Sequence, residues 1–121
     1  MIILNLPFPI SVNAMYANKG RSRTKSLRYR TWAVAAGWDV TRQKQKPIKG
    51  WYALTLILNE KDNRRRDPDN FVKSVSDLLT THNLIEDDSK CSSITVERFK
   101  ASRASCEVIV RPSNGIPARA A

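Results

Sequence analysis

The sequence predicts a single α+β domain in which two helices pack against a mixed β-sheet. The chain has 121 residues, which is enough for one hydrophobic core and too few for two. Short apolar segments typical of strands alternate with two segments of helical periodicity. The expected order is therefore strand, helix, strand, helix, strand, strand. We expect this domain to span residues 1–111 and a disordered tail to span residues 112–121.

The first predicted strand and a basic loop occupy the start of the chain. Residues 2–6 are apolar at every position but one. They are followed by Pro7 and Pro9, which have no amide hydrogen to donate to a sheet, so the strand ends there. Residues 19–26 lack apolar periodicity and carry four positive charges. Such a loop either binds phosphate groups or is only exposed to solvent.

Residues 27–45 form the first predicted helix, and residues 51–58 form the strand that follows it. Apolar side chains recur along the helix in spite of Gly37, and lysines are concentrated near its end, where the helix dipole favours them. Trp32 and Trp38 either belong to the core or stack on bases, and core packing is favoured. Residues 51–58 are aromatic and aliphatic and are expected near the middle of the sheet.

The second predicted helix has the most regular apolar stripe in the chain. Asp67 is a good N-cap residue, Pro68 is tolerated at the first helical position, and Asn83 suits a left-handed residue at the end. The stripe has a period of 3.6 residues and consists of Phe71, Val72, Val75, Leu78 and Leu79.

Two further strands, at residues 94–99 and 105–111, complete the predicted sheet. Both helices are expected to cover one face of this sheet. The other face would then be available for an oligomer.

The charge of the chain is strongly positive and unevenly distributed. The formal net charge is +10 and the sequence pI is about 10.1, which favours a polyanionic partner such as nucleic acid. Basic residues dominate the first 46 positions, whereas eight of the eleven acidic residues lie between positions 60 and 88. Acids within a nucleic-acid-binding surface repel phosphate unless a cation lies between them.

Cysteine usage and hydropathy argue against a secreted, zinc-binding or membrane protein. Cys91 and Cys106 belong to no paired motif, and His82 is the only histidine. The apolar start lacks the basic region of a signal peptide, and no segment has the length of a membrane span. We therefore expect a cytoplasmic protein with reduced cysteines.

Residues 64–73 and 86–88 carry the pattern with the most evident chemistry. The first segment reads Arg-Arg-Arg-Asp-Pro-Asp-Asn-Phe-Val-Lys, and the second reads Glu-Asp-Asp. Asp67 and Asp69 repel each other unless a divalent cation or the neighbouring arginines compensate their charge. Phosphodiester hydrolysis needs an activated water and stabilised negative charge, and Mg²⁺ held by carboxylates supplies both. A metal site at this helix start, completed by an acid from the second segment, is one interpretation.

Ordinary ion pairing is the other interpretation of the same residues. Asp67 can cap the helix, and Asp69 can pair with Lys73 across one helical turn, which is worth about 0.3–0.5 kcal/mol. Residues 64–66 can neutralise the acids in a salt-bridge network. Asp77, one further turn along the helix, is expected to be structural. The spacing alone leaves the metal site and the ion-pair network open.

Taken together, the motifs resemble those of the RusA-type Holliday-junction resolvases, a family often encoded by prophages. The resemblance rests on residues 64–73, on Asp77-Leu78-Leu79 and on residues 86–88. In addition, residues 6–13 are similar to the proline-rich turn of this family, which ends in asparagine. The resemblance extends over about residues 2–111.

This resemblance implies a homodimeric DNA endonuclease that resolves four-way junctions in recombination and repair by paired, Mg²⁺-dependent nicks, with Mn²⁺ as a substitute. The metal-binding aspartates of the family correspond to Asp67, Asp69 and Asp88, and its active-site lysine corresponds to Lys73. Asp88 is preferred to Asp87 by counting from Asp69, and Asn13 and Asn70 belong to the motifs without an assigned role. The residues expected to contact DNA phosphates are Lys19, Arg21, Arg23, Lys25, Arg64, Arg65 and Arg66.

The alternative from another functional class is a non-catalytic basic module that binds nucleic acid. Its acids would serve only in capping and ion pairing, and its binding would not depend on metal. On either interpretation we expect a bacterial or phage-encoded protein associated with the nucleoid and not with a membrane.

Overall fold

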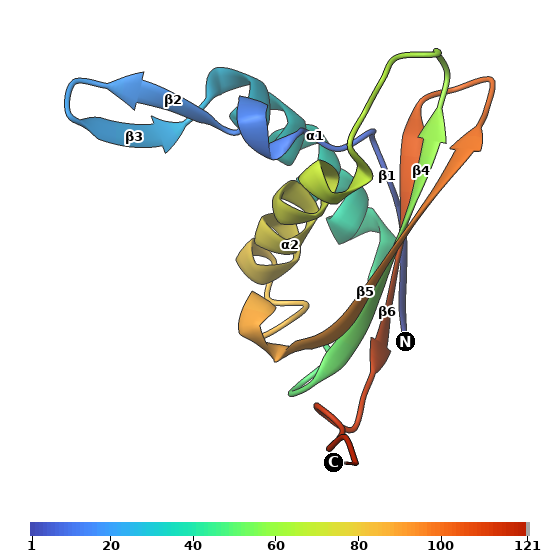
Figure 1. Cartoon of the computed structure of the whole chain (residues 1–121). Coiled ribbons are helices and arrows are strands. Elements are labelled where there is room, and N and C mark those ends of the chain that lie inside the picture. Colours follow the sequence, from blue (N-terminus) through green and yellow to red (C-terminus); the bar gives the residue numbers. More distant parts are fainter. Residues whose placement is uncertain (121) are drawn as a thin grey trace.

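The computed structural model describes residues 1–120 and confirms the predicted α+β architecture, with two α-helices and a mixed sheet (Figure 1). The helices and strands are β1 (Ile2–Leu6), β2 (Tyr16–Lys19), β3 (Ser22–Lys25), α1 (Leu27–Gln43), β4 (Tyr52–Glu60), α2 (Val72–Thr81), β5 (Cys91–Lys100) and β6 (Ser105–Pro112). Three short 3₁₀ helices are η1 (Val12–Ala14), η2 (Pro68–Phe71) and η3 (Asp88–Lys90). Within the described residues, no helix combines the length and the apolar character needed to cross a bilayer.

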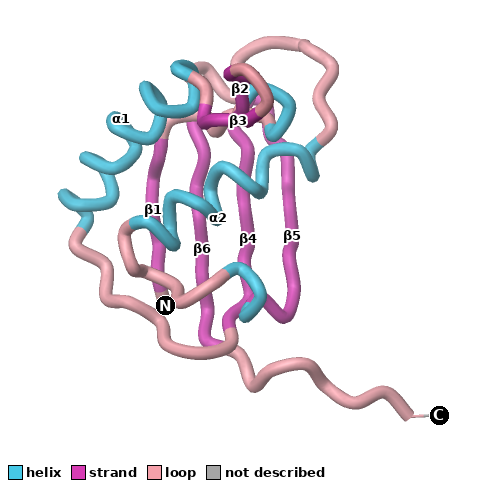
Figure 2. Tube along the Cα trace, turned by 90° about the vertical axis from the view of Figure 1, so that its left-hand side faces the viewer, coloured by secondary structure: helices cyan, strands magenta, loops and turns pink. Residues whose placement is uncertain are grey.

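Four strands form the main sheet in the order β1-β6-β4-β5. Strand β4 is an inner strand, as predicted, and pairs antiparallel with β6 and parallel with β5. A parallel pair requires a crossover connection, and α2 lies within the connection between β4 and β5. Both helices lie on the same face of the sheet, which confirms the predicted layering (Figure 2).

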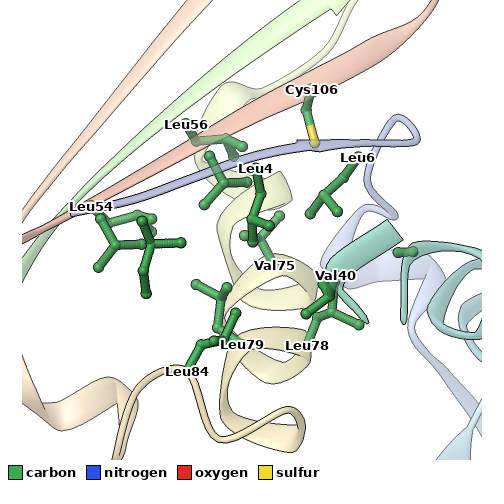
Figure 3. Close-up of a cluster of buried hydrophobic side chains, with 14 of the residues drawn as sticks. Leu4, Leu6, Val40, Leu54, Leu56, Val75, Leu78, Leu79, Leu84 and Cys106 are labelled. Carbon is green, nitrogen blue, oxygen red and sulfur yellow. The ribbon is translucent and has the colours of Figure 1, made fainter. Parts of the chain in front are cut away.

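The hydrophobic core lies between this face of the sheet and the two helices. Residues of β4 alternate strictly between buried and half-buried, so Leu54 and Leu56 point toward the helices. They meet Val75 and Leu79 from α2 and Val40 from α1 in one buried cluster (Figure 3). The core thereby fixes α2, which carries Lys73, against the sheet.

The predicted first helix is present, and its two tryptophans have different environments. Trp32 is buried, and its Nε1 donates a hydrogen bond to the carbonyl of Pro7 at 3.2 Å. Trp38 is exposed, so core packing holds for Trp32 and not for Trp38. The structure explains the glycine at position 37 within α1, because a Cβ there would lie 2.9 Å from Nε2 of His82 at the end of α2.

The basic segment predicted as a loop is instead an antiparallel hairpin, β2–β3, which projects from the body of the domain (Figure 1). Its residues are largely exposed and therefore lack the alternation of apolar residues that predicts a strand. Gly20 provides the positive φ of the turn. The side chains of Arg23 and Lys25 both lie over the ring of Tyr16, so cation–π contacts hold the two strands together.

The start of the second helix differs in detail from the expectation. The α-helix begins at Val72 and is preceded by η2, and the Asp67 side chain makes no capping hydrogen bond. Asn83 has the predicted left-handed conformation, with φ of 58°. After β6, Ser113 donates from its amide to the Trp51 carbonyl and Gly115 lies against the Trp51 ring. The predicted boundary at residue 111 remains a prediction.

The two tryptophans of α1 give a matched test of this packing. Trp32→Ala should lower the free energy of unfolding by about 3–5 kcal/mol, because it removes a buried ring. Trp38→Ala should change it by less than about 0.5 kcal/mol. Denaturant unfolding of both variants measures the difference, and equal losses would contradict the placement of α1.

Candidate active site

The loop that leads to the acidic motif is held by a buried carboxylate at the end of β4. Glu60 is 4% exposed and accepts hydrogen bonds from Nε and Nη2 of Arg98 on β5, at 2.5 and 2.8 Å. It also accepts from Nη1 of Arg66 at 3.0 Å. The hydrogen bonds from Arg98, followed by those from Arg66, hold the pKa of Glu60 below its usual value despite burial.

The Arg66 side chain is directed toward the protein and not toward the solvent. It is 16% exposed, pairs with Asp62 at 2.6 Å, and lies 4.9 Å from the centre of the Phe8 ring. Arg98 also donates to the Arg66 carbonyl at 3.2 Å. The guanidinium is thus occupied on several sides by the protein itself and anchors the loop, and the expected contact of Arg66 with phosphate remains a prediction.

Asp67 and Asp69 follow directly from this anchored loop. Asp67 precedes η2 and Asp69 lies within it, and the amide of Asn70 donates to the Asp67 carbonyl at 3.0 Å. Both aspartates are exposed. Within the described residues, neither carboxylate makes an ion pair or a side-chain hydrogen bond. Arg64 and Arg66 pair with other acids, and Arg65 makes no ion pair within the described residues. Lys73 pairs with Asp77 and Asp88. The capping bond, the Asp69–Lys73 pair and the Arg–Asp network of the second interpretation are therefore not formed among residues 1–120.

Lys73 contacts two carboxylates on the exposed side of α2. Its Nζ lies 2.9 Å from Oδ1 of Asp77 and 3.3 Å from Oδ2 of Asp88. The hydrogen bond to Asp77 is the largest cause of a raised pKa of Lys73. These residues line an open pocket of about 300 Å³ together with Lys25, Tyr29, Thr80, Thr81 and Asp87.

The three acids of residues 86–88 have different surroundings. Glu86 accepts a hydrogen bond from the Gly50 amide at 2.7 Å, and Asp87 accepts one from the Ser89 hydroxyl. Asp88 opens η3 and is the one that contacts Lys73. The predicted preference for Asp88 over Asp87 therefore agrees with the side chain that reaches the lysine.

The donor chemistry of Asp67, Asp69 and Asp88 fits a hard divalent cation. Carboxylate oxygens are the ligands that Mg²⁺ prefers, and two of the three carboxylates have no competing protein partner among residues 1–120. Asp88 is half exposed and its contact with Lys73 is the longer of the two that this lysine makes. In the described part of the chain, no three such side chains are gathered into one ready-made metal cluster.

The other predicted site residues lie in η1, on the hairpin and in the loop before η2. Asn13 lies in η1, which contacts both η2 and α2. Except for Lys25 and Arg66, the residues expected to contact phosphate are exposed. They form two groups: Lys19, Arg21 and Arg23 on the hairpin, and Arg64 and Arg65 in the loop. Lys25 is half-buried and pairs with Asp77 at 2.5 Å.

Comparison with known proteins agrees with the motifs. A family model for endodeoxyribonuclease RusA matches residues 7–111. The chain belongs to the RusA family. A similar protein is the crossover junction endodeoxyribonuclease RusA of Aquifex aeolicus (strain VF5), which is 26% identical over 114 residues. That match covers 93% of this chain and 90% of the Aquifex protein. The family predicted from the sequence is therefore confirmed, and with it a nuclease activity.

Two residues near the site of this RusA-family chain gain roles that the sequence did not predict. Glu60 lies beyond the strand predicted at 51–58, and its role was missed because its partner Arg98 lies 38 positions away. Asp77 was expected to be structural, and it is the residue that joins Lys73 to Lys25. Its position four residues after Lys73 is the feature by which sequence analysis can find it.

Glu60→Gln should lower the melting temperature at pH 7 by roughly 5 °C or more, because two arginines lose their anion. The pKa of Glu60 is lowered in the folded protein, so its contribution is complete above the ordinary value of 4.5. It is lost as the pH falls through the lower folded value. Thermal melts at pH 7, 5 and 3 should therefore show the difference between wild type and variant shrinking below about pH 4.5.

Glu97→Gln is the matched control, because Glu97 is exposed on the neighbouring strand β5. Its melting temperature should follow that of the wild type at every pH. Equal shifts for the two variants would show that the Glu60 cluster does not hold the loop.

Proposed function

We propose that this chain resolves four-way (Holliday) DNA junctions in recombination and repair by paired, Mg²⁺-dependent hydrolysis of phosphodiester bonds. Family membership supports DNA cleavage, and the name of the Aquifex relative supports a crossover junction as substrate. The observation with most weight is the arrangement of charge at η2 and α2. Two unpaired aspartates lie at the helix start, and Lys73 contacts the third acid, Asp88.

In this proposal Asp67, Asp69 and Asp88 hold Mg²⁺, and Mn²⁺ can substitute for it. When bound, the ion supplies Lewis-acid chemistry, which activates water and offsets negative charge on the phosphoryl group. Lys73 contributes a positive charge that stabilises the developing charge on the phosphate or on the leaving oxygen. Its contact with Asp88 keeps this ammonium at the edge of the proposed ligand set.

The surfaces proposed to hold the junction are the projecting hairpin and the loop before η2. Lys19, Arg21 and Arg23 are exposed on the hairpin, and Arg64 and Arg65 are exposed on the loop. Phosphate contacts by such side chains position DNA without reading its sequence. Because binding releases counterions, affinity should fall steeply with salt. We further propose a cytoplasmic enzyme of a bacterium or phage that acts at the nucleoid, where this substrate occurs.

Asp69→Asn and Lys73→Ala should each abolish cleavage of a synthetic four-way junction in Mg²⁺, with a loss of at least about 100-fold. Both variants should still bind the junction with nearly wild-type affinity, because the proposed phosphate contacts are elsewhere. Single-turnover cleavage and gel-shift titration measure the two properties. Wild-type cleavage by Asp69→Asn would make the ligand assignment wrong.

The double variant R21A/R23A is the complementary control on the hairpin. It should weaken junction binding and lower the slope of log affinity against log salt by about one unit per residue. At saturating enzyme its cleavage rate should remain close to that of the wild type. Lys46→Ala, an exposed lysine beyond the other end of α1, should change neither property. A non-catalytic binding module would show salt-dependent binding and no product in any of these variants.

We also propose that the enzyme is a homodimer, because a four-way junction offers two equivalent strands to two protomers. The sheet face opposite the helices is the surface proposed for this contact. Ile3 on β1 and Phe99 on β5 are 48% and 51% exposed, and their paired neighbours Ile109 and Asn59 belong to the same face.

Sedimentation equilibrium of the wild type should give twice the 13.7 kDa mass of one chain. Phe99→Glu should give the mass of one chain, because it puts a charge into the proposed interface. Ile94→Glu is the control, since Ile94 is equally exposed on the same strand and pairs with Leu54 of the opposite face. A monomeric wild type at working concentrations would contradict the proposal.

A further inference from the structure

The Asp77 carboxylate lies between two ammonium groups that come from different elements. Its Oδ1 is 2.9 Å from Nζ of Lys73, one turn earlier on α2. Its Oδ2 is 2.5 Å from Nζ of Lys25, the last residue of the hairpin strand β3. Each oxygen thus serves one lysine. Burial alone would raise the pKa of Asp77, but the hydrogen bonds from Lys25 and Lys73 hold it below its usual value.

Lys73 contacts two carboxylates, and its distance to Asp77 is the shorter of the two. The other contact, Asp88 at 3.3 Å, belongs to the proposed ligand set, and its oxygens are needed there. Once those oxygens are engaged, Asp77 is the anion that continues to fix the direction of the lysine side chain. A flexible four-carbon stem has many rotamers, so an ammonium without such a partner is poorly placed for a phosphate.

For the hairpin, Lys25 is a fixed point of attachment to α2. Its ammonium also donates to the Tyr16 hydroxyl at 3.3 Å and lies 4.7 and 4.6 Å from the ring centres of Tyr16 and Tyr29. Burial works against the charged form of Lys25, yet the bonds to Asp77 and Tyr16 leave its pKa above the usual value. Among the described residues, Lys25–Asp77 is the only ion pair that joins the hairpin to the rest of the chain.

We propose that Asp77 is a positioning residue for the cleavage reaction, which holds Lys73 in place and ties it to the DNA-binding hairpin. The inference rests on the proposed function, because Lys73 is taken to act on the phosphate. The Asp77 carboxylate then holds the hairpin, which is proposed to bind a DNA arm, in a fixed position relative to Lys73, which is proposed to act on the phosphate. Removing it leaves Lys25 and Lys73 as neighbouring like charges, which repel each other and displace Lys73 from the site edge.

The test measures cleavage and binding separately in Asp77→Asn, which keeps the side-chain size and removes the charge. With enzyme in excess over a four-way junction and with saturating Mg²⁺, the cleavage rate per folded molecule should fall about 10- to 100-fold, as for outer residues that orient a reacting group. Junction affinity should stay within about twofold, because Asp77 is not a phosphate contact. Asp77→Glu, which keeps the charge, should retain more of the rate than Asp77→Asn.

Two double variants show whether the effect passes through the lysines. In a Lys73→Ala background, Asp77→Asn should cause no further loss of residual rate, whereas a purely structural role would lower both backgrounds alike. Lys25→Met should lower the rate alone and should add nothing to Asp77→Asn. Additive losses in either cycle would overturn the inference.

The same measurements separate this inference from the function on which it rests. A wild-type rate in Asp77→Asn, or equal losses in Asp77→Asn and Asp77→Glu, would overturn the positioning role while Asp69→Asn remains inactive. Continued cleavage by Asp69→Asn would overturn the proposed metal site instead. Far-ultraviolet circular dichroism gives the folded fraction by which each rate is divided.

Discussion

Glu60 carries a negative charge into the interior at the end of the central strand, and two arginines neutralise it there. A buried carboxylate without partners would be costly, so the chain on both sides must adopt the path that delivers these arginines. One of them, Arg66, immediately precedes the first aspartate of the motif. The direction in which the acidic loop enters η2 is therefore set by charge burial as much as by apolar packing.

The contacts of Glu60 with Arg66 and Arg98 also explain how three arginines can directly precede two aspartates without pairing with them. Arg66 is directed inward to Glu60 and Asp62, while Arg64 and Arg65 remain exposed. None of the three pairs with Asp67 or Asp69 in the described structure. The aspartates consequently keep their oxygens available to solvent or, on the proposed assignment, to a metal ion. Among the acids near this loop, Glu60 and Asp62 pair with arginines, whereas Asp67 and Asp69 pair with none in the described residues.

Local patterns predicted most of the fold, and contacts distant in sequence account for what they missed. The apolar stripe of α2, the strand predicted at 51–58 and the left-handed Asn83 depend on neighbouring residues, and each is present, with the strand observed as β4 at 52–60. The hairpin was missed because rings and cations stabilise it in place of a buried apolar face. The roles of Glu60 and Asp77 depend on Arg98 and Lys25, which lie 38 and 52 positions away. Spacing within one segment carries no information about such partners.

The parallel pairing of β4 with β5 has a consequence for the growing polypeptide. Asp67 and Asp69 precede the crossover helix, whereas Asp88 directly precedes β5, which lies alongside β4 in the folded domain. Parallel pairing is non-local and forms late in folding. On the proposed assignment, a chain still emerging from the ribosome presents two ligands without the third. On the same assignment, the proposed metal site is complete only when β5 has paired with β4, so a chain that ends before β5 lacks one of its ligands.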